Sequence, residues 1–327
     1  MKAIVLRSYG SPDVLQYEDI EKPIAAADEV LVKVRAASVN PLDWRLVRGE
    51  PCVIRAATGL RKPKSARVGA DVAGVVEAVG INVNQFRPGD SVFGAIGTSP
   101  GAFAEYVCAK EDALVLKPEN LTFEQAAAVP VAALTALQGL RKGQLQAGQT
   151  ILINGAAGGV GTFSVQIAKS WGARVTGVCS TRNVEMVRSI GADDVIDYTR
   201  EDFTASAMRY DLIFDCMGNR SLSACRSVMS KEGTYVIVGG PSGRCVGPLG
   251  SLLKPLLLSP FVSQRMVACM SRQSNADLLI LKALIESNKV RPVIDRTYAL
   301  SEVAQALRYS EEGHARGKVV ITIEHRQ

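Results

Sequence analysis

The stretch from Thr150 to Gly161 reads T-I-L-I-N-G-A-A-G-G-V-G and decides the fold of this chain. Its first five residues are mostly apolar and β-branched, and they predict a strand that ends at Asn154. The glycines predict a tight turn, and residues 162–171, which carry apolar side chains at helical spacing, predict a helix. This order is typical of a pyrophosphate-binding site, because glycines let the phosphates approach the backbone and the helix N-terminus presents unpaired N–H groups.

The spacing of the small residues matches the dinucleotide-binding fingerprint in all but its first position. Ala156 stands in place of the first glycine, while Gly158 and Gly161 take the second and third positions. A second apolar run at residues 174–179 lies where the next strand of such a unit is expected. The alternative is a tight turn that binds no ligand. We expect a dinucleotide to contact Ala156, Gly158, Gly159, Val160 and Gly161.

Strand candidates alternate with helical segments after the fingerprint, which predicts a parallel, doubly wound α/β sheet. These candidates are residues 174–179, 194–197, 212–215 and 234–238. The earlier part of the chain instead has short alternating runs, at 29–37, 71–79, 91–95 and 102–107, which are typical of an antiparallel, barrel-like domain. We expect a substrate domain over residues 1–123, a nucleotide-binding domain over 124–264, and a return segment, 265–327, that completes the first domain.

The composition narrows the class of protein. The 327 residues are 47% hydrophobic and 21% charged, as in ordinary globular proteins. Seven cysteines without a C-x-x-C pair favour reduced thiols and a cytoplasmic location.

Membrane and nucleic-acid partners are not expected. Prolines and a lysine interrupt the most apolar segment, 249–261, so we expect no membrane span. The net charge is +6, but the basic cluster within residues 55–67 lacks interleaved aromatic side chains, so we expect a solvated loop and no nucleic-acid partner.

The residues after the second strand indicate which dinucleotide binds. An NAD site usually carries an acidic residue there, which bonds the ribose 2′-OH. This chain has Ser180, Arg182 and Asn183 and no carboxylate among them. Hydroxyl, guanidinium and amide donors suit a 2′-phosphate, so we expect NADPH as the cofactor. The alternative for Ser180 and Asn183 is helix capping, and for Arg182 a solvated position.

The chain resembles the medium-chain dehydrogenase/reductases, and among them the zinc-free quinone oxidoreductase branch, over essentially its whole length. The matching residues include S-V-N-P-L-D at 38–43, G-A-D-V-A-G-V-V at 69–76, R-P-G-D at 87–90, the fingerprint at 156–161 and G-A-D at 191–193. The resemblance implies a Rossmann doubly wound parallel sheet inserted in a GroES-like β-barrel catalytic domain. It also implies a homodimer.

The zinc ligands of the zinc-dependent relatives are missing. Those relatives have a cysteine where this chain has Asn40, a histidine where it has Ala70, and a further ligand near Pro130. A catalytic zinc needs about three protein ligands. We therefore expect no metal, and no oxidation of an alcohol through a zinc-bound alkoxide.

The resemblance also assigns roles to single residues. It implies that Asn40 lies beside the nicotinamide, that Thr135 contacts its ribose or carboxamide, and that Tyr198 lies near the 2′-phosphate. It likewise implies that Val238, Gly239 and Gly240 border the nicotinamide.

Other expectations come from the residues themselves. Cys216 follows the strand expected at 212–215, at the edge where ligands bind in such sheets, so we expect it to line the cofactor cleft without a redox role. Asn40 and Asp43 are the candidate catalytic residues, although Asn40 could simply be a turn residue and Asp43 could instead cap a helix that runs toward Gly49. Asp71 is expected to be a buried acid paired with a basic group.

These observations predict an NADPH-dependent, zinc-independent oxidoreductase that transfers hydride to quinones or α,β-unsaturated carbonyls. Two alternatives remain open. One is an enoyl or enone double-bond reductase of a specific pathway, and the other a non-catalytic NADPH-binding protein that senses redox state. The substrate wall is expected in loops 50–68 and 241–265, whose shape the sequence does not give.

Overall fold

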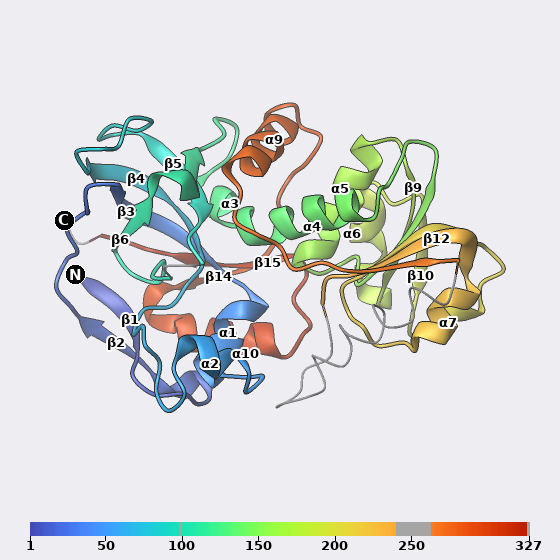
Figure 1. The fold of residues 1–327 in the computed structure, drawn as a ribbon, viewed down its shortest axis with the longest axis horizontal. Coiled ribbons are helices and arrows are strands. Elements are labelled where there is room, and N and C mark those ends of the chain that lie inside the picture. The colour runs from blue at the N-terminus through green and yellow to red at the C-terminus, as the bar shows by residue number, and fades with distance from the viewer. Residues whose placement is uncertain (98–99, 240–262, 326–327) are drawn as a thin grey trace. The chain divides into compact units, whose positions relative to one another are not determined.

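The computed structural model describes residues 1–97, 100–239 and 263–325 and contains two compact units (Figure 1). The first unit comprises Met1–Leu134, Gln273–Asn288 and Pro292–Gln327. The second comprises Thr135–Arg272 and Lys289–Arg291. The first unit contains a seven-stranded and a two-stranded sheet, and the second unit contains a six-stranded sheet.

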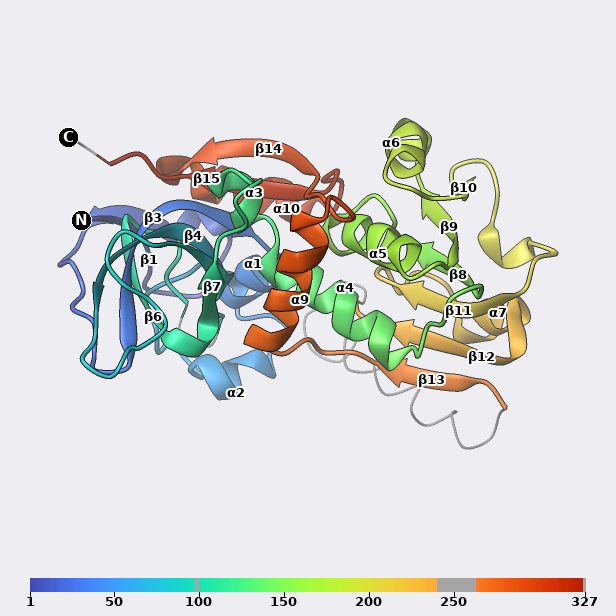
Figure 2. The same cartoon turned by 90° about the horizontal axis from the view of Figure 1, so that it is seen from above.

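The second unit is built on a six-stranded parallel sheet. Its strands are β8 (Thr150–Asn154), β9 (Arg174–Cys179), β10 (Asp194–Asp197), β11 (Tyr210–Asp215), β12 (Met229–Ile237) and β13 (Arg265–Ala268). Their spatial order is β10-β9-β8-β11-β12-β13, and Figure 2 shows β10 at one edge and β13 at the other. In order of appearance this is 3-2-1-4-5-6, the arrangement of a dinucleotide-binding sheet. The predicted parallel Rossmann sheet is confirmed.

Helices connect these strands, as the alternating pattern predicted. They are α5 (Gly159–Ser170), α6 (Val184–Ser189) and α7 (Leu222–Ser227), and α4 (Pro130–Lys142) precedes β8. Helix α4 packs closely on the sheet, because a Cβ added at Gly139 would lie 2.5 Å from the ring of Phe214. A larger side chain at this position would push the helix away from β11.

The first unit is β-rich. Its strands are β1 (Lys2–Leu6), β2 (Leu15–Asp19), β3 (Glu29–Val39), β4 (Asp71–Val79), β5 (Ser91–Ala95), β6 (Tyr106–Lys110), β7 (Leu114–Leu116), β14 (Ile294–Ala299) and β15 (Lys318–Thr322). Seven of them form a sheet in the order β14-β15-β3-β4-β5-β7, with β6 also paired to β3. Its helices are α1 (Pro41–Arg48), α2 (Ile54–Thr58), α3 (Phe123–Ala127), α9 (Asn275–Glu286) and α10 (Val303–Glu311).

Local sequence signals account for much of this unit. Val30, Val32 and Val34, which alternate in the sequence, are all fully buried in its core. Thr122 caps α3: its hydroxyl accepts from the backbone N–H of Gln125, and the Gln125 side chain accepts from the backbone N–H of Thr122. One strand is displaced from its expected position, since β6 begins at Tyr106 and residues 102–104 instead run beside β1.

The last part of the chain contributes to both sheets. Strand β13 pairs with β12 in the parallel sheet, although residues from 265 onward were expected to return to the first domain. Strands β14 and β15 do join the first unit, where β15 pairs antiparallel to β3. This pairing aligns Val319 with Val39 and so brings the start of β15 to the end of β3. Among the described residues, no helix is long and apolar enough to cross a membrane.

Candidate functional site

The glycine-rich turn of the second unit is shaped to admit phosphates. Helix α5 has Gly158 at its N-cap, and this residue places no side chain over the first amides of the helix. A Cβ added at Gly158 would touch only the carbonyl oxygen of Gly155, at 3.5 Å. A Cβ added at Gly161 would lie 2.1 Å from the same oxygen, which means that Gly161 is needed for close packing of the helix on the strand. The two glycines therefore serve different purposes, as the fingerprint requires.

The remaining fingerprint residues lie at the same edge. The backbone N–H of Ala156 donates to the carbonyl of Val178 at 3.0 Å, which ties the turn to the neighbouring strand β9. Gly159 and Val160 form the first residues of α5. The expected set is thus brought together at the carboxyl ends of β8 and β9, with its amides at the positive end of the helix dipole.

The end of β9 carries the residues expected near the 2′-phosphate. Ser180 is the N-cap of a short 3₁₀ turn at Thr181–Asn183, and the Asn183 amide donates to the Ser180 hydroxyl at 3.2 Å. The buried amide oxygen of Asn183 has no hydrogen-bond partner among the residues that the structure describes. Arg182 is exposed. Tyr198 lies near these residues, because its backbone N–H donates to the carbonyl of Cys179 at the end of β9, and its side chain is 49% exposed.

A carboxylate that was not expected from the sequence also lies at this edge of the sheet. Asp197, at the end of β10, lies next to the end of β9, and its Oδ2 accepts from the Thr181 hydroxyl at 2.5 Å. Its Oδ1 accepts from the backbone N–H and the hydroxyl of Thr199, and Arg200 Nε lies 3.5 Å from Oδ2. These donors lower the pKa of Asp197, the Thr181 hydrogen bond most of all. Both oxygens of this carboxylate are therefore already hydrogen-bonded within the chain.

Cys216, Val238 and Gly239 lie together at the ends of β11 and β12. The backbone N–H of Val238 donates to the carbonyl of Asp215, and a Cβ added at Gly239 would lie 2.1 Å from the carbonyl oxygen of Cys216. Burial raises the pKa of the Cys216 thiol, which disfavours a reactive thiolate. Gly240 lies outside the described residues.

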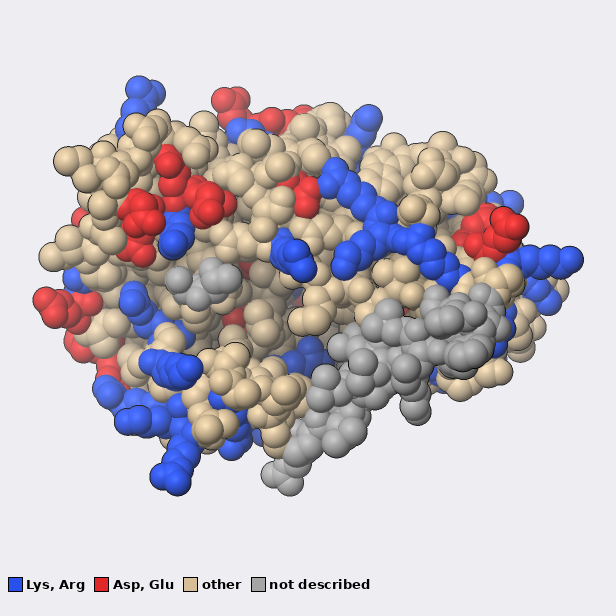
Figure 3. All heavy atoms as spheres, viewed as in Figure 1, with Lys and Arg blue, Asp and Glu red and all other residues tan. Residues whose placement is uncertain are grey.

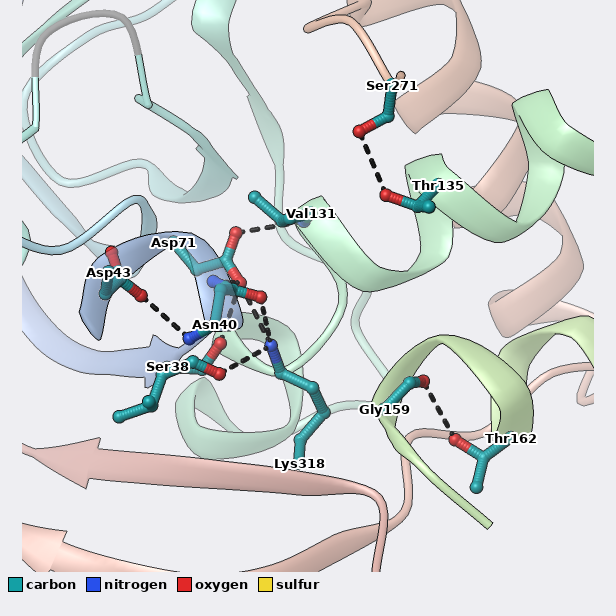
Figure 4. Close-up of polar contacts among 11 residues, drawn as sticks. Ser38, Asn40, Asp43, Asp71, Val131, Thr135, Gly159, Thr162, Ser271 and Lys318 are labelled. Atoms are coloured by element: carbon teal, nitrogen blue, oxygen red, sulfur yellow. Dashed lines mark hydrogen bonds and ion pairs between the residues drawn. The ribbon is translucent and has the colours of Figure 1, made fainter. Parts of the chain in front are cut away.

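Thr135 occupies a buried position on α4, where it is 7% exposed. Its hydroxyl donates to the Ser271 hydroxyl at 2.9 Å, and both residues belong to the second unit (Figure 4). Nothing in the sequence pointed to Ser271, since it follows the strand β13 in a segment without a recognisable motif.

In the first unit, Asn40 belongs to a buried polar cluster. Its amide nitrogen donates to Asp71 Oδ2 at 2.8 Å, and its amide oxygen accepts from Lys318 Nζ at 2.7 Å. Ser38 also donates to Asp71 Oδ2, at 2.7 Å, and the backbone N–H of Val131 donates to Oδ1 at 2.9 Å. Figure 4 shows these side chains pointing toward one another. The expectation that Asp71 is a buried acid paired with a basic group is confirmed, and that group is Lys318.

Asp43 holds the start of helix α1. Its Oδ2 accepts from the backbone N–H of Asn40 at 2.7 Å, and the helix ends at Gly49, which has a φ of 61°. The side chain is buried, and its Oδ1 has no hydrogen-bond partner within the described part of the chain. Burial is the main cause that raises the pKa of Asp43 to about 7. This geometry favours the capping role of Asp43 over direct contact with a substrate.

The donor set around Asn40 does not suit zinc. Asn40 and Ala70 offer neither thiolate nor imidazole, and the Asn40 oxygen already faces an ammonium group. A divalent cation there would meet the positive charge of Lys318 at close range. Within the part of the chain that the structure describes, no three His, Cys, Asp or Glu side chains are arranged to hold a metal ion.

The loop expected to form one substrate wall, 50–68, borders a hollow of about 230 Å³. Its lining is largely apolar and includes Leu6, Tyr9, Leu46, Pro63 and Val68. The other expected loop lies mostly outside the described residues.

The basic cluster in loop 50–68 is not one continuous surface. Arg55 points inward, and its guanidinium donates to the carbonyls of Gly49 and Arg48. On the face drawn in Figure 3, basic side chains occur in several places with acidic ones between them.

Comparisons with known proteins agree with this architecture. Residues 26–119 match the family described as alcohol dehydrogenase GroES-like domain, and residues 190–321 match the one described as zinc-binding dehydrogenase. A solved structure of a quinone oxidoreductase from Coxiella burnetii superposes with a TM-score of 0.87, at 32% identity over 99% of both chains.

Curated relatives match over nearly the whole chain. A chloroplastic NADPH-dependent alkenal/one oxidoreductase of Arabidopsis thaliana is 38% identical over 98% of this chain and 79% of its own. A 2-methylene-furan-3-one reductase of Solanum lycopersicum is 36% identical with the same coverage. A chloroplast envelope quinone oxidoreductase homolog of Arabidopsis thaliana is 33% identical over 98% of both chains. The chain is an NAD(P)-dependent oxidoreductase that belongs to the medium-chain dehydrogenase/reductase superfamily, in its quinone oxidoreductase-like branch.

Proposed function

We propose that this chain is a zinc-independent, NADPH-dependent reductase that transfers hydride to quinones or to α,β-unsaturated carbonyl compounds. The main support for the proposal is the environment of Asn40. An amide stands there in place of a metal ligand, and its oxygen accepts a hydrogen bond from a buried ammonium. Quinones and activated alkenes accept a hydride without such a metal, and the relatives named above as reductases act on compounds of these kinds.

The second unit supplies the cofactor site in this proposal. The first turn of α5 holds the pyrophosphate through its amides, and Ser180, Arg182, Asn183 and Tyr198 recognise the 2′-phosphate. Thr135, Cys216, Val238 and Gly239 border the nicotinamide end. When bound, the reduced nicotinamide supplies the hydride, and the protein orients it and excludes water.

The first unit contributes Asn40, whose amide lies beside the nicotinamide in this proposal. Asp43 contributes indirectly, because its carboxyl fixes the backbone of Asn40. The loop at residues 50–68 forms part of the substrate wall with the apolar hollow beside it, which suits a small, largely apolar acceptor.

The test is NADPH and NADH oxidation, followed by absorbance, with a para-quinone and a simple enone, each with and without a chelator. We expect chelator-insensitive oxidation that prefers NADPH. The better of the two acceptors identifies the substrate class. Preference for NADH would contradict the assignment of the residues after β9, and activity lost to the chelator would contradict the zinc-independent reading.

A protein that binds NADPH tightly but oxidises it with no acceptor would instead fit the sensor alternative. This outcome is distinguished by measuring NADPH binding, through the fluorescence of the bound cofactor, in the same samples.

We also propose a homodimer located in the cytoplasm. Strand β13 is one of the two outer strands of the parallel sheet in the described residues, and an outer strand can pair with a second copy. The described cysteines form no disulfides, in accord with a reducing compartment. Light scattering after size exclusion and cell fractionation test the two statements separately.

A further inference from the structure

Beyond its place where a metal would otherwise be expected, the buried ammonium of Lys318 has been given no role of its own in the proposed function. Lys318 is 3% exposed and lies at the start of β15, and Gly317 before it has a φ of 88°. Its Nζ contacts three oxygens: Asn40 Oδ1 at 2.7 Å, Val39 O at 3.1 Å and Asp71 Oδ2 at 3.4 Å. A lysine ammonium has three N–H groups, so these contacts use all of them. Lys318 is therefore not placed to give a proton to a substrate.

The cluster allows the Asn40 amide only one orientation. An ammonium can only donate hydrogen bonds, and an ionised carboxylate can only accept them. The amide oxygen of Asn40 must therefore face Lys318, and its nitrogen must face Asp71, as the structure has them. Reversing the amide would bring its N–H₂ group against the ammonium and its oxygen against the carboxylate.

Burial makes this constraint strong. Asp71 is fully buried, and Asn40 is 2% exposed. In such a place a lost partner leaves a polar group without water to replace it. The Lys318–Asp71 ion pair also balances charge within the cluster, so the amide is held between two opposite charges.

We propose that Lys318 is a positioning residue, which acts through Asn40 by fixing the orientation of its amide toward the nicotinamide. This inference rests on the proposed function, since it requires that Asn40 lies beside the reacting ring. The second N–H of the amide and the second lone pair of its oxygen then each point in a fixed direction. Loss of Lys318 leaves the amide free to turn, and misplaced groups near a reaction centre slow the chemical step.

The test is a double-mutant cycle between Asn40→Ala and the charge-neutral pair Lys318→Met/Asp71→Asn. The two substitutions together remove both charges, so that no unpaired carboxylate remains buried. We expect the pair to lower kcat about 10- to 100-fold, with the Kd for NADPH within about twofold of the original. In the Asn40→Ala background it should lower kcat no further, because the group through which Lys318 acts is gone.

Two further measurements separate positioning from general damage. The emission spectrum of bound NADPH should change in the same way in Asn40→Ala and in the Lys318/Asp71 variant. Lys117→Met is the control, because Lys117 is half-buried and its ammonium also has hydrogen-bond partners, the backbone carbonyls of Pro118 and Leu121. It should leave kcat and the emission spectrum unchanged.

If the double variant does not fold, Lys318→Arg takes its place in the same cycle. It keeps the positive charge that Asp71 needs, but its planar guanidinium cannot reproduce the three contacts of the ammonium. Additive losses in kcat, or no loss at all, would overturn the role of Lys318 while leaving the proposed function intact. Absence of turnover in the unmodified protein with every quinone and enone would overturn both.

Discussion

The ammonium of Lys318 donates to the amide oxygen of Asn40 at 2.7 Å, although 278 residues separate the two in the chain. The antiparallel pairing of β15 with β3 makes this contact, since it places the start of β15 at the end of β3. The last strand of the chain is thus part of the candidate site. Four predictions test other parts of that site.

The two glycines of the turn predict different defects on substitution. Gly158→Ala should leave the melting temperature nearly unchanged, because its Cβ finds room at 3.5 Å from Gly155 O and its φ of −82° suits alanine. The same methyl group should obstruct the approach of the pyrophosphate and weaken NADPH binding by about tenfold or more.

Gly161→Ala is the matched comparison. Its Cβ would lie 2.1 Å from Gly155 O, so we expect a loss of about 2 kcal/mol or more in the free energy of unfolding. Thermal unfolding and fluorescence titration separate the two effects. Equal stability losses in both variants would contradict the assignment.

Arg182→Ala should weaken NADPH more than NADH. A charge-assisted hydrogen bond to phosphate contributes about 1.5–3 kcal/mol, so we expect a rise in the KM for NADPH of about tenfold or more with the KM for NADH little changed. Arg188→Ala is the control, because Arg188 lies on the following helix and pairs with Glu185 at 2.9 Å. A parallel rise for both cofactors would show that Arg182 does not recognise the 2′-phosphate.

Asp43→Asn should change how stability depends on pH. Burial raises the pKa of Asp43 to about 7, above its unfolded value, so the folded state holds a proton that the unfolded state has lost. Below about pH 4 the carboxyl is protonated in both states, so its titration does not change the free energy of unfolding. As pH rises from about 4 to about 7, it lowers that free energy by at most about 4 kcal/mol. Asparagine can still accept from the Asn40 backbone and never ionises.

The variant should consequently be more stable than the original protein at pH 8, and the difference should shrink toward pH 4. Urea unfolding of both proteins at a series of pH values measures it. A constant difference across this range would mean that Asp43 does not titrate in the way that its burial indicates.

Removal of metal should have no effect. The position that holds a cysteine in the zinc-dependent relatives is an asparagine bonded to an ammonium. Exhaustive dialysis against a chelator should therefore leave the melting temperature and NADPH oxidation unchanged, and metal analysis should find less than stoichiometric zinc. Recovery of activity only after zinc is added back would refute this prediction.

The sequence by itself determined the parallel sheet, because strand, turn and helix signals are local. Residues 150–161 specify their own turn through the special geometry of glycine, and β9 and β10 have the bounds that the sequence predicted. The same holds for the capping of α3 by Thr122 and for the absence of zinc ligands at Asn40 and Ala70, which is a matter of residue type.

Only the tertiary structure decided which distant groups meet. Sequence reasoning expected a basic partner for Asp71 but could not name Lys318, because strand pairing between β3 and β15 is non-local and leaves no spacing signal. It likewise missed Asp197 beside Thr181, which depends on the parallel register of β10 with β9. Local propensity fixes the elements of this protein, whereas the partners of its buried charges follow from the order of its strands.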